Sequence, residues 1–404
     1  MVSIEEAQGI ILQVTVPLPC QELPLLQGLG RVICGEVRSP RHIPLTDNSA
    51  MDGYAFCYAT LVGDRLKAAG FVPAGVSHSD SVPAGCAVRI MTGAPVPVGC
   101  DTVVPIEEVE VHEAEIHLTG RVQQGSHVRH RGEDVREGAC VIRDRALIRA
   151  QEIGMLASLG LTSFPAYRRA RVAVLATGDE LLPLGGTPVP GKIVNSNSVS
   201  LEAMVLDAGA QPVCSGIAPD DFEATKRTIR AALQEGDLLI TTGGVSVGDK
   251  DFVKEAIQEL GGEILFWKVD MKPGKPVAFA VLDGKPVFAL PGNPVAAMVG
   301  FEQFVRPALL KMMGHPRLFR PMVKAYLTAP LSNKGERPHL VRAMVTLEEG
   351  VYRVAAAGNQ GSANLLSMIE SNALLRLPPK ASLATGDPIE VTLLDRVFEM
   401  GQPG

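Results

Sequence analysis

The strongest constraint on the fold is an alternation of strand-like and helix-like segments that begins at Arg171. Residues 171–177, RVAVLAT, form a short and almost continuous apolar run, which is typical of a strand buried in a parallel sheet. Residues 197–209 then carry apolar side chains at helical spacing, and Gly209 suits a helix C-cap. Further strand-like segments follow at 211–218, 237–244 and 263–269, with helix-like segments at 221–236 and 249–262. This alternation predicts a parallel sheet covered by helices on both faces.

The segments around this unit have other patterns. A hairpin at 278–290, turning at Asp283-Gly284, and a helix-like run at 295–314 close the unit. At the N-terminus, Ser3 and Glu6 form a capping-box pattern ahead of an amphipathic helix to about Val14. Short β-rich runs separated by Gly and Pro then precede a return to helical spacing, which indicates an inserted β subdomain. After about residue 321, strand-like runs predict a small β-barrel or sandwich.

These patterns predict a multidomain chain of the α/β and β classes. Its parts are a three-layer α/β domain with a mostly parallel sheet, an N-terminal helical and extended region with an inserted small β domain, and a C-terminal β-barrel-like domain. The predicted boundaries are 1–40 with 143–168, 41–142, 169–316 and 317–404.

Composition and charge exclude several classes of protein. A chain of 404 residues with 46% hydrophobic content can bury a large core, and its net charge of −6 argues against a general nucleic-acid binder. Glu5 and Glu6 stand where a signal peptide carries basic residues, and no apolar run approaches the length of a membrane span, so we expect a cytoplasmic protein without membrane contact. The seven cysteines are scattered and never form C-x-x-C, which predicts ordinary reduced thiols.

Acidic residues follow three of the predicted strands. In an open α/β sheet, ligands bind outside the carboxyl ends of the strands, so these acids should meet at one edge. Carboxylates in such an arrangement suit Mg²⁺, which completes its octahedron with waters and phosphate oxygens. The three pairs are Asp179 with Glu180, Asp220 with Asp221, and Asp249 with Asp251. Alternatively, Asp220, Asp221 or Asp249 caps the helix that follows, and Glu180 lies in a solvated loop.

The glycines of TTGG, at 241–244, offer what the acids do not. Their bare backbone N–H groups can approach a phosphate closely, and a helix N-terminus follows. The sequence is neither a P-loop nor a dinucleotide G-x-G-x-x-G, so this signal is weak alone and depends on the neighbouring loops.

Two Pro-Gly turns lie further along the chain. In KPGKP, at 272–276, a tight turn lets Lys272 and Lys275 project to one side, where they repel each other unless an anion lies between them. The alternative is a solvated surface turn. In PGNP, at 291–294, a rigid elbow leads into a helix, and its alternative is simple helix initiation.

The N-terminal β region contributes three further turns. MDGY places Asp52 beside a glycine, and TGAP does the same for Thr92. RHRGED places Arg129, Arg131, Glu133 and Asp134 around Gly132. For the basic and acidic groups of this last turn, an internal salt-bridge cluster is the favoured interpretation from the residues alone. The alternative is that these residues complete a pocket of a neighbouring chain.

Eight motifs in this order resemble the MoeA family of molybdopterin molybdenumtransferases, related to the E domain of gephyrin and plant Cnx proteins. The resemblance runs from the N-terminus to about residue 395. It rests on NSAMDGYA, RIMTGAPVP, RGEDV, ATGDEL, TTGGVSVGDKD, MKPGKP, LPGNPV and GNQGSANL.

The resemblance implies an activity and an assembly. Family members use adenylylated molybdopterin, molybdate and Mg²⁺ to form the molybdenum cofactor and release AMP. They are elongated homodimers of four domains, and each active cleft lies between the α/β domain of one subunit and the small β domain of the other. The implied partners are small-molecule substrates, a molybdopterin adenylyltransferase and acceptor molybdoenzymes.

The resemblance also implies the site residues. The implied catalytic positions are Asp52, Thr92, Asp134, Glu180, Asp220 and Asp251, and the last three are also candidate Mg²⁺ ligands. Molybdate would be held by Lys272, Lys275, Pro276, Arg342 and Ser362. The pterin and nucleotide would contact Arg129, Thr177, Gly178, Thr242, Gly243, Gly244, Ser246, Lys268, Pro291, Gly292, Asn293 and Pro294. Two points stay open, because Arg337 rivals Arg342 and Asp249 is a further candidate beside Asp251.

Two alternative functions remain at this point. One is a molybdopterin-binding or scaffold protein without turnover, which could lose the acids and lysines that this chain keeps. The other is a molybdopterin adenylyltransferase, against which the KPGKP turn and the flanking β domains argue.

Overall fold

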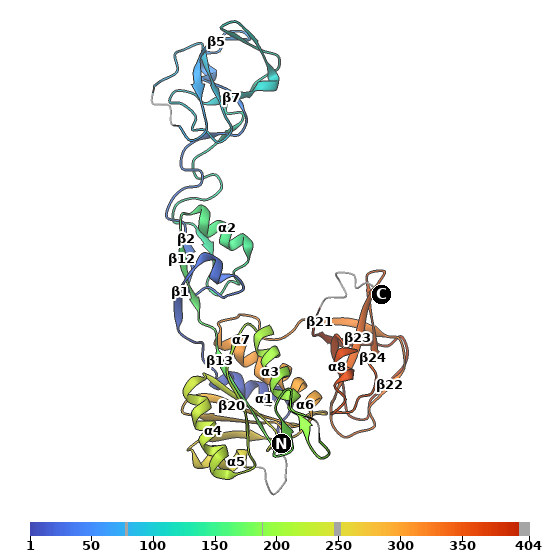
Figure 1. Cartoon of the computed structure of the whole chain (residues 1–404). Coiled ribbons are helices and arrows are strands. Elements are labelled where there is room, and N and C mark those ends of the chain that lie inside the picture. Colours follow the sequence, from blue (N-terminus) through green and yellow to red (C-terminus); the bar gives the residue numbers. More distant parts are fainter. Residues whose placement is uncertain (77–79, 188, 246–251, 396–404) are drawn as a thin grey trace. The chain divides into compact units, whose positions relative to one another are not determined.

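The structure is a computed structural model that describes residues 1–76, 80–187, 189–245 and 252–395 (Figure 1). Its contacts divide the chain into two compact units. The core unit comprises residues 1–34, 145–148 and 164–404, and the insert unit comprises residues 35–144 and 149–163. The division into four domains stays a prediction, because two units neither confirm nor exclude it.

A six-stranded mixed sheet forms the centre of the core unit, in the order β16-β13-β17-β20-β19-β18. The first four strands of this order are parallel, and β19 and β18 are added through antiparallel pairs. The predicted hairpin is confirmed, since Asp283 and Gly284 both have positive φ between β19 and β20. The strands are β13 (Arg171–Thr177), β16 (Gln211–Ala218), β17 (Leu238–Thr242), β18 (Glu263–Trp267), β19 (Ala278–Leu282) and β20 (Lys285–Leu290).

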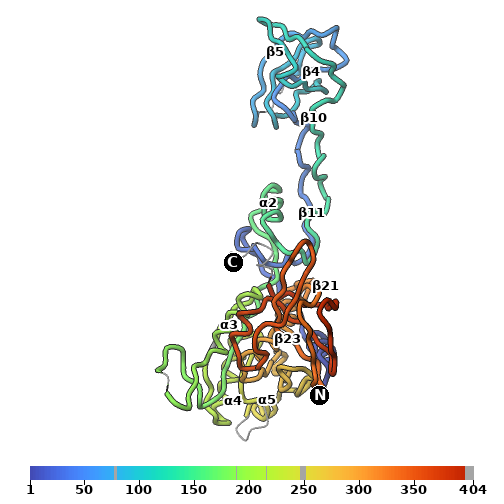
Figure 2. Tube along the Cα trace, turned by 90° about the vertical axis from the view of Figure 1, so that its right-hand side faces the viewer, coloured from blue at the N-terminus to red at the C-terminus, as the bar shows by residue number. Residues whose placement is uncertain are grey.

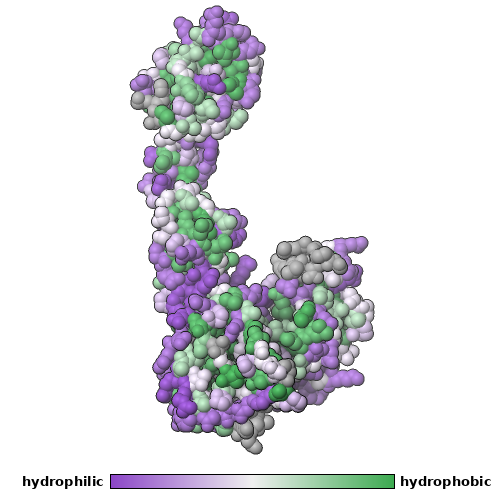
Figure 3. Space-filling model, viewed as in Figure 1, coloured by the Kyte–Doolittle hydropathy of each residue, from purple (hydrophilic) through white to green (hydrophobic). Residues whose placement is uncertain are grey.

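Helices cover both faces of this sheet, as the alternating pattern predicts (Figure 1). On one face lie α4 (Phe222–Glu235) and α5 (Val253–Glu259). On the other lie α1 (Ile4–Val14), α3 (Ser196–Asp207) and the continuous helix formed by α6 (Pro294–Gly300), η4 (Phe301–Val305) and α7 (Arg306–Met312). The outward side of α4 is hydrophilic, since residues such as Arg227 and Arg230 are exposed there (Figure 3).

Local sequence signals explain the ends of these helices. Ser3 and Glu6 form the predicted capping box of α1 through bonds of 3.1 and 2.7 Å. Asp221 accepts a hydrogen bond of 2.7 Å from the Ala224 N–H and caps α4, so one of the acids at this edge is structural. Gly209 follows α3 with φ of 83°, a conformation that glycine adopts without strain.

The C-terminal part of the core unit is a closed five-stranded barrel, in the order β21-β24-β23-β25-β27. The strands are β21 (Met322–Leu327), β23 (His339–Glu348), β24 (Val351–Ala356), β25 (Ala373–Leu377) and β27 (Pro388–Leu393). Closure removes the open strand edges that would otherwise pair with another chain. Smaller elements beside the barrel are β22 (Leu331–Ser332), α8 (Leu366–Ile369) and β26 (Ser382–Leu383).

The insert unit contains a second six-stranded sheet, which confirms the predicted β texture. Its order is β7-β4-β6-β5-β9-β8, with β4 (Gly53–Phe56), β5 (Arg65–Val72), β6 (Cys86–Ile90), β7 (Thr102–Pro105), β8 (Val109–His112) and β9 (Glu115–Leu118). The chain enters and leaves along two extended segments that run side by side, where β2 (Val37–Arg38) pairs with β11 (Cys140–Ile142) (Figure 2). The predicted helix α2 (Ala150–Ser158) follows.

One expectation about the cysteines is wrong. Cys20 and Cys34 form a disulfide with a Cα–Cα distance of 6.2 Å, although the scattered pattern predicts reduced thiols. The two residues come together because β1 (Cys20–Pro24) pairs with β12 (Ser163–Tyr167), while Cys34 donates its N–H to the Pro165 carbonyl. Among the described residues, no helix is both long enough and apolar enough to span a membrane.

Candidate active site

Two acidic loops meet at the carboxyl edge of the sheet, after β13 and β16. The Asp220 N–H donates to the Asp179 carboxylate at 3.1 Å, and the Asp179 N–H donates to the Asp220 carboxylate at 3.3 Å. Glu180 is exposed in the same loop, with its carboxylate above Gly178. Adjacent parallel strands therefore bring two of the three predicted acidic pairs together, while Asp249 and Asp251 lie outside the described residues.

The TGG loop after β17 requires its glycines. A Cβ atom on Gly243 would lie 2.5 Å from the Thr177 carbonyl oxygen, and one on Gly244 would lie 2.8 Å from the Thr177 hydroxyl. Both glycines also have positive φ, of 87° and 63°. The Thr177 hydroxyl is buried without a hydrogen-bond partner among the described residues. A buried hydroxyl without a hydrogen-bond partner costs free energy, which is a physical reason to expect a further polar partner at this position.

Asn197, near the start of α3, ties this loop to the second Pro-Gly turn. Its side-chain amide donates to the Thr242 hydroxyl at 2.9 Å and to the Gly292 carbonyl at 2.8 Å. The Thr242 hydroxyl in turn donates to the Pro291 carbonyl at 3.0 Å. These bonds hold the two glycine-containing loops in one fixed arrangement.

The KPGKP turn is held between the sheet and the barrel. Across the base of the turn, the N–H of Val269, three residues before it, donates to the Lys275 carbonyl at 2.9 Å. Toward β23, the Lys272 N–H donates to the Pro338 carbonyl at 2.9 Å and the Leu340 N–H donates to the Lys272 carbonyl at 2.7 Å. These bonds hold both ends of the turn, whereas neither lysine ammonium group bonds to another described residue; Lys272 is exposed and Lys275 is half-buried.

Two buried basic residues on β23 lie next to this turn. Arg342 is fully buried, and the acceptors that its guanidinium bonds among the described residues are all neutral, namely the Ser367 hydroxyl and the carbonyls of Asn359 and Gly361. Its Nη1 has no partner among the described residues, and neither has Nε2 of the buried His339. Burial lowers the pKa of Arg342. Burial, with the nearby charges of Lys272 and Arg342, lowers the pKa of His339 to about 4.

The GNQGSANL loop of the barrel region contacts the PGNP elbow. The Asn293 amide donates to the Ser362 hydroxyl at 3.0 Å, and the Val295 N–H donates to the Ser362 carbonyl at 3.2 Å. Pro294 also begins α6, so the elbow both starts a helix and holds the loop. Arg342 donates to the Gly361 carbonyl, so its buried guanidinium also holds the GNQGSANL loop in place.

The other predicted positions are distributed around this region. Lys268 follows β18 with φ of 85°, and Pro276 closes the KPGKP turn. Arg337, the rival of Arg342, lies 3.8 Å from the Asp270 carboxylate and is partly exposed. Ser246 lies outside the described residues, as Asp251 does.

The motifs of the insert unit also come together, but with their charges paired. The Asp52 carboxylate accepts hydrogen bonds of 2.7 Å from both the N–H and the hydroxyl of Thr92, and these bonds lower the pKa of Asp52. Arg129 bonds Asp134, which raises the pKa of Arg129. The strand β3 (Asn48–Ser49) joins the motifs, since it pairs with β10 (Val128–Arg129) and bonds the segment after Thr92. The salt-bridge interpretation of the RHRGED turn is confirmed for Arg129, which pairs with Asp134 and Glu133.

Three family models match most of the chain. They describe the MoeA N-terminal region (domain I and II) at residues 2–160, a probable molybdopterin binding domain at 173–311 and the MoeA C-terminal region (domain IV) at 324–394. A molybdopterin molybdenumtransferase 2 from Mycobacterium tuberculosis is 36% identical over 403 residues, covering 97% of this chain and 99% of the relative. The chain belongs to the MoeA family. It is therefore an enzyme of molybdenum cofactor biosynthesis.

Further relatives agree with membership of the MoeA family. A molybdopterin molybdenumtransferase from Haemophilus influenzae is 33% identical over 397 residues, covering 97% of this chain and 98% of the relative. Two crystal structures of a molybdopterin biosynthesis MoeA protein from Pyrococcus horikoshii, each 29% identical, superpose with TM-scores of 0.85 and 0.81. They cover 98% and 97% of this chain and all of the compared chains. The resemblance inferred from the eight motifs is confirmed.

Two residues of this MoeA-family site are absent from the sequence-based prediction. Asn197 lies in an NSNS run at the start of α3, where an Asn is normally assigned to helix capping, although the cap itself is Asn195. His339 lies between Arg337 and Arg342 in RPHLVR, and this concentration of basic residues is the signal that could have found it. Both act through contacts between segments distant in sequence, which spacing alone does not show.

Proposed function

We propose that this protein inserts molybdenum into adenylylated molybdopterin, using molybdate and Mg²⁺, and releases AMP with the finished cofactor. Molybdate is a tetrahedral dianion, and the proposal rests mainly on positive charge that has no counter-charge among the described residues. Lys272, Lys275 and Arg342 supply this charge where the KPGKP turn meets β23. An anion held there would relieve the cost of burying Arg342.

The residues around this charge divide into two groups by chemistry. Lys272, Lys275 and Arg342 would donate charge-assisted hydrogen bonds to molybdate, with Pro276 shaping the turn and Ser362 adding a hydroxyl. The second group faces the pterin and its phosphates: the Thr177 hydroxyl and the backbone around Gly178, Thr242, Gly243, Gly244 and Ser246, with Lys268 and the elbow Pro291, Gly292, Asn293 and Pro294. Catalysis would then consist mainly of positioning and charge stabilisation.

The acids at the sheet edge fit Mg²⁺ in part. Within the described ranges, no three His, Cys, Asp or Glu side chains gather as a metal-binding group, so an all-protein cage is not supported. Glu180 and Asp220 nevertheless supply carboxylates beside the phosphate-binding loop, and Mg²⁺ needs only one or two of these. We propose Glu180, Asp220 and Asp251 as its ligands, with Asp249 a further candidate. A bound Mg²⁺ would neutralise the pyrophosphate of the substrate.

We propose that the protein acts as a homodimer whose insert unit completes the site of the second copy. The fixed geometry of Asp52, Thr92, Arg129 and Asp134 supports this, because each side chain is held by bonds within its own unit. Asp52, Thr92 and Asp134 would be catalytic, and Arg129 would contact the nucleotide. We place this reaction in the cytoplasm, between a molybdopterin adenylyltransferase that supplies the substrate and molybdoenzymes that accept the product.

A direct assay tests the proposed reaction. Purified protein is incubated with adenylylated molybdopterin, molybdate and Mg²⁺, and AMP release is followed by chromatography. We expect release that depends on molybdate and falls strongly in Lys275→Ala. If the wild-type protein binds the adenylylated pterin but releases no AMP, it is a binding or scaffold protein, and the proposed reaction is wrong. If Lys275→Ala keeps an unchanged molybdate dependence, the molybdate site lies elsewhere.

A further inference from the structure

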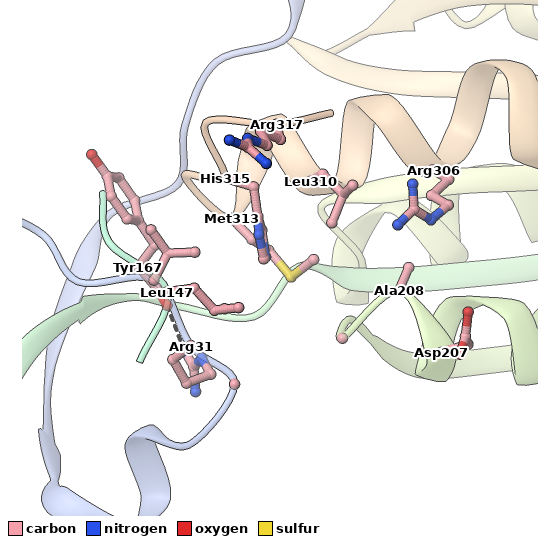
Figure 4. Close-up of a pocket in the computed structure, with 13 residues that line it drawn as sticks. Arg31, Leu147, Tyr167, Asp207, Ala208, Arg306, Leu310, Met313, His315 and Arg317 are labelled. Carbon is pink, nitrogen blue, oxygen red and sulfur yellow. Dashed lines mark hydrogen bonds between the residues drawn. The ribbon is translucent and has the colours of Figure 1, made fainter. Parts of the chain in front are cut away.

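A second group of basic side chains lines a cavity of about 300 Å³ in the core unit (Figure 4). Arg31 comes from the segment after η1 (Leu25–Gly28), whereas Arg306, His315 and Arg317 come from α7 and the turn that follows it. None of these residues belongs to the site proposed for molybdate. The MoeA resemblance assigns no role to them.

The cavity exists because three chain segments end close together there. The helix α3 ends at Asp207 and α7 ends at Met312, and each is followed by a glycine with positive φ. A Cβ atom on Gly314 would lie 2.2 Å from the ring of Tyr167, so only glycine permits this approach. The fold thus keeps an open hollow between two helix ends and β12.

The basic groups in this hollow bond mainly to neutral acceptors. Arg31 donates to the Tyr167 carbonyl at 2.5 Å, and Nη1 of Arg306 donates to the Leu318 carbonyl at 3.4 Å. Nε of Arg306 is buried without a partner among the described residues. Burial, with a neighbouring positive charge in each case, lowers the pKa of Arg31, Arg306 and His315.

Nearby acids offset only part of this charge. Asp207 is the one acid in the described lining, and its side chain is 69% exposed. It accepts a bond of 3.1 Å from Arg320, which also bonds Glu302 at 2.9 Å. The negative charges of Asp207 and Glu302 favour the charged form of Arg306, but both carboxylates are hydrogen-bonded to Arg320. Arg31 and Arg317 form no ion pair with a described acid, so the hollow keeps an excess of positive charge.

We propose that this cavity binds a small phosphate-bearing anion. A phosphate accepts several hydrogen bonds at once, and guanidinium groups match its oxygens better than other cations do. The volume lies at the lower end of pockets that hold small molecules, and the apolar side chains of Val32, Leu310 and Met313 in the lining can hold a compact organic group. The bonds to the Tyr167 and Leu318 carbonyls leave Nε of Arg306 without a partner among the described residues, and an anion would supply one.

Titration calorimetry with two probes tests the proposal. Inorganic phosphate and phenyl phosphate are titrated at constant ionic strength, without molybdate, into the wild type and into Lys275→Ala, which lacks one charge of the proposed molybdate site. We expect saturable binding that weakens about tenfold in Arg306→Gln and about fivefold in Arg317→Gln. Arg317 is exposed and forms no hydrogen bond with a described residue, so its variant should fold even if Arg306→Gln does not. Arg230→Gln, on the exposed side of α4, is the matched control.

Each outcome has a defined meaning. Tighter binding of phenyl phosphate indicates a phosphorylated organic ligand, and equal binding of the two probes indicates free phosphate; both support the proposal. It is overturned if neither probe binds, or if binding is unchanged in both arginine variants. Binding that is lost in Lys275→Ala instead would assign the probe to the molybdate site. AMP release by Arg317→Gln should equal that of the wild type, which keeps this test separate from the proposed reaction.

Discussion

The candidate site residues of the two units differ in how their charges are satisfied. In the insert unit, Asp52 accepts two bonds from Thr92, and Arg129 bonds Asp134. In the core unit, Lys272 has a free ammonium group and Arg342 has an unpartnered Nη1 among the described residues. Paired charges fix the shape of a turn without needing a ligand. The buried, unpaired charge of Arg342 costs free energy, whereas Lys272 is exposed, and a ligand of opposite charge is the simplest compensation for the buried charge.

Removing the unpaired charge should have the largest effect. In Lys272→Ala/Lys275→Ala, each lost charge-assisted bond is worth about 1.5–3 kcal/mol, so kcat/KM for molybdate should fall on the order of 1,000-fold. Stability should change little, because neither ammonium group bonds a described residue. The measurement is AMP release as a function of molybdate concentration, with urea unfolding in parallel.

The exposed Lys334 provides the matched control for this pair. Lys334→Ala should leave both activity and stability unchanged. An equal loss in the control would mean that overall charge, rather than the KPGKP turn, attracts molybdate.

A mixing experiment tests whether the two units act across a dimer. Asp52→Ala removes the insert-unit acid and Lys275→Ala removes the core-unit charge, and each variant alone should be nearly inactive. If each site combines units from two chains, a random mixture contains one intact site in half of its dimers and should recover about a quarter of wild-type activity. AMP release is measured after the variants are unfolded and refolded together.

The same two variants refolded separately and then combined at low temperature provide the control. They should stay inactive as long as the subunits do not exchange. No recovery after joint refolding, from variants that each form dimers, would place both residues in a site built by one chain.

The pH dependence of stability should distinguish the buried His339 from the exposed histidines of the chain. Its pKa falls from 6.5 in the unfolded chain to about 4 in the fold, mainly because of burial and then because of Lys272 and Arg342. Between these values the unfolded chain binds more protons, so stability decreases as the pH falls from 6.5 toward 4. By pH 5 the loss attributable to His339 should be about 2 kcal/mol.

Urea unfolding at pH 7.5 and pH 5 measures this loss in the wild type and in His339→Gln. The variant should lose less stability than the wild type over the same interval. His127→Gln, which removes an exposed histidine of the insert unit, should retain the full wild-type dependence. The explanation is wrong if the two variants behave alike.

The fold was largely predictable because its signals are local. The apolar run at 171–177 and the Asp283-Gly284 turn appear in the structure as β13 and the β19–β20 hairpin. Alternation along the chain also places the acids of β13 and β16 at one edge, because adjacent parallel strands end together.

The site was less predictable because it depends on contacts between distant segments. Nothing in the sequence near Lys272 indicates that β23 binds its backbone, or that His339 is buried beside it. The Cys20–Cys34 disulfide was missed for the same reason, since the β1–β12 pairing joins residues more than a hundred positions apart. Side-chain spacing predicts which residues lie on one face of a single helix or strand. A site of this kind is formed by residues from several elements, whose contacts that spacing does not show.

The smallest effect is expected from the paired charges of the insert unit. Arg129 and Asp134 are each almost half exposed, so water already solvates the two groups and their pairing should stabilise the protein by no more than about 1 kcal/mol. A double-mutant cycle of Arg129→Gln and Asp134→Asn, read by urea unfolding, measures this coupling. The coupling should shrink further at high salt, since exposed charges are screened.

A coupling of several kcal/mol would mean that disrupting this pair costs as much free energy as disrupting a buried pair. The inferred difference between the charges of the two units would then be wrong. If instead the coupling is small while both variants lose AMP release, the pair serves to position groups that act on substrate, which is the role that a paired cluster can fill and an unpaired one cannot.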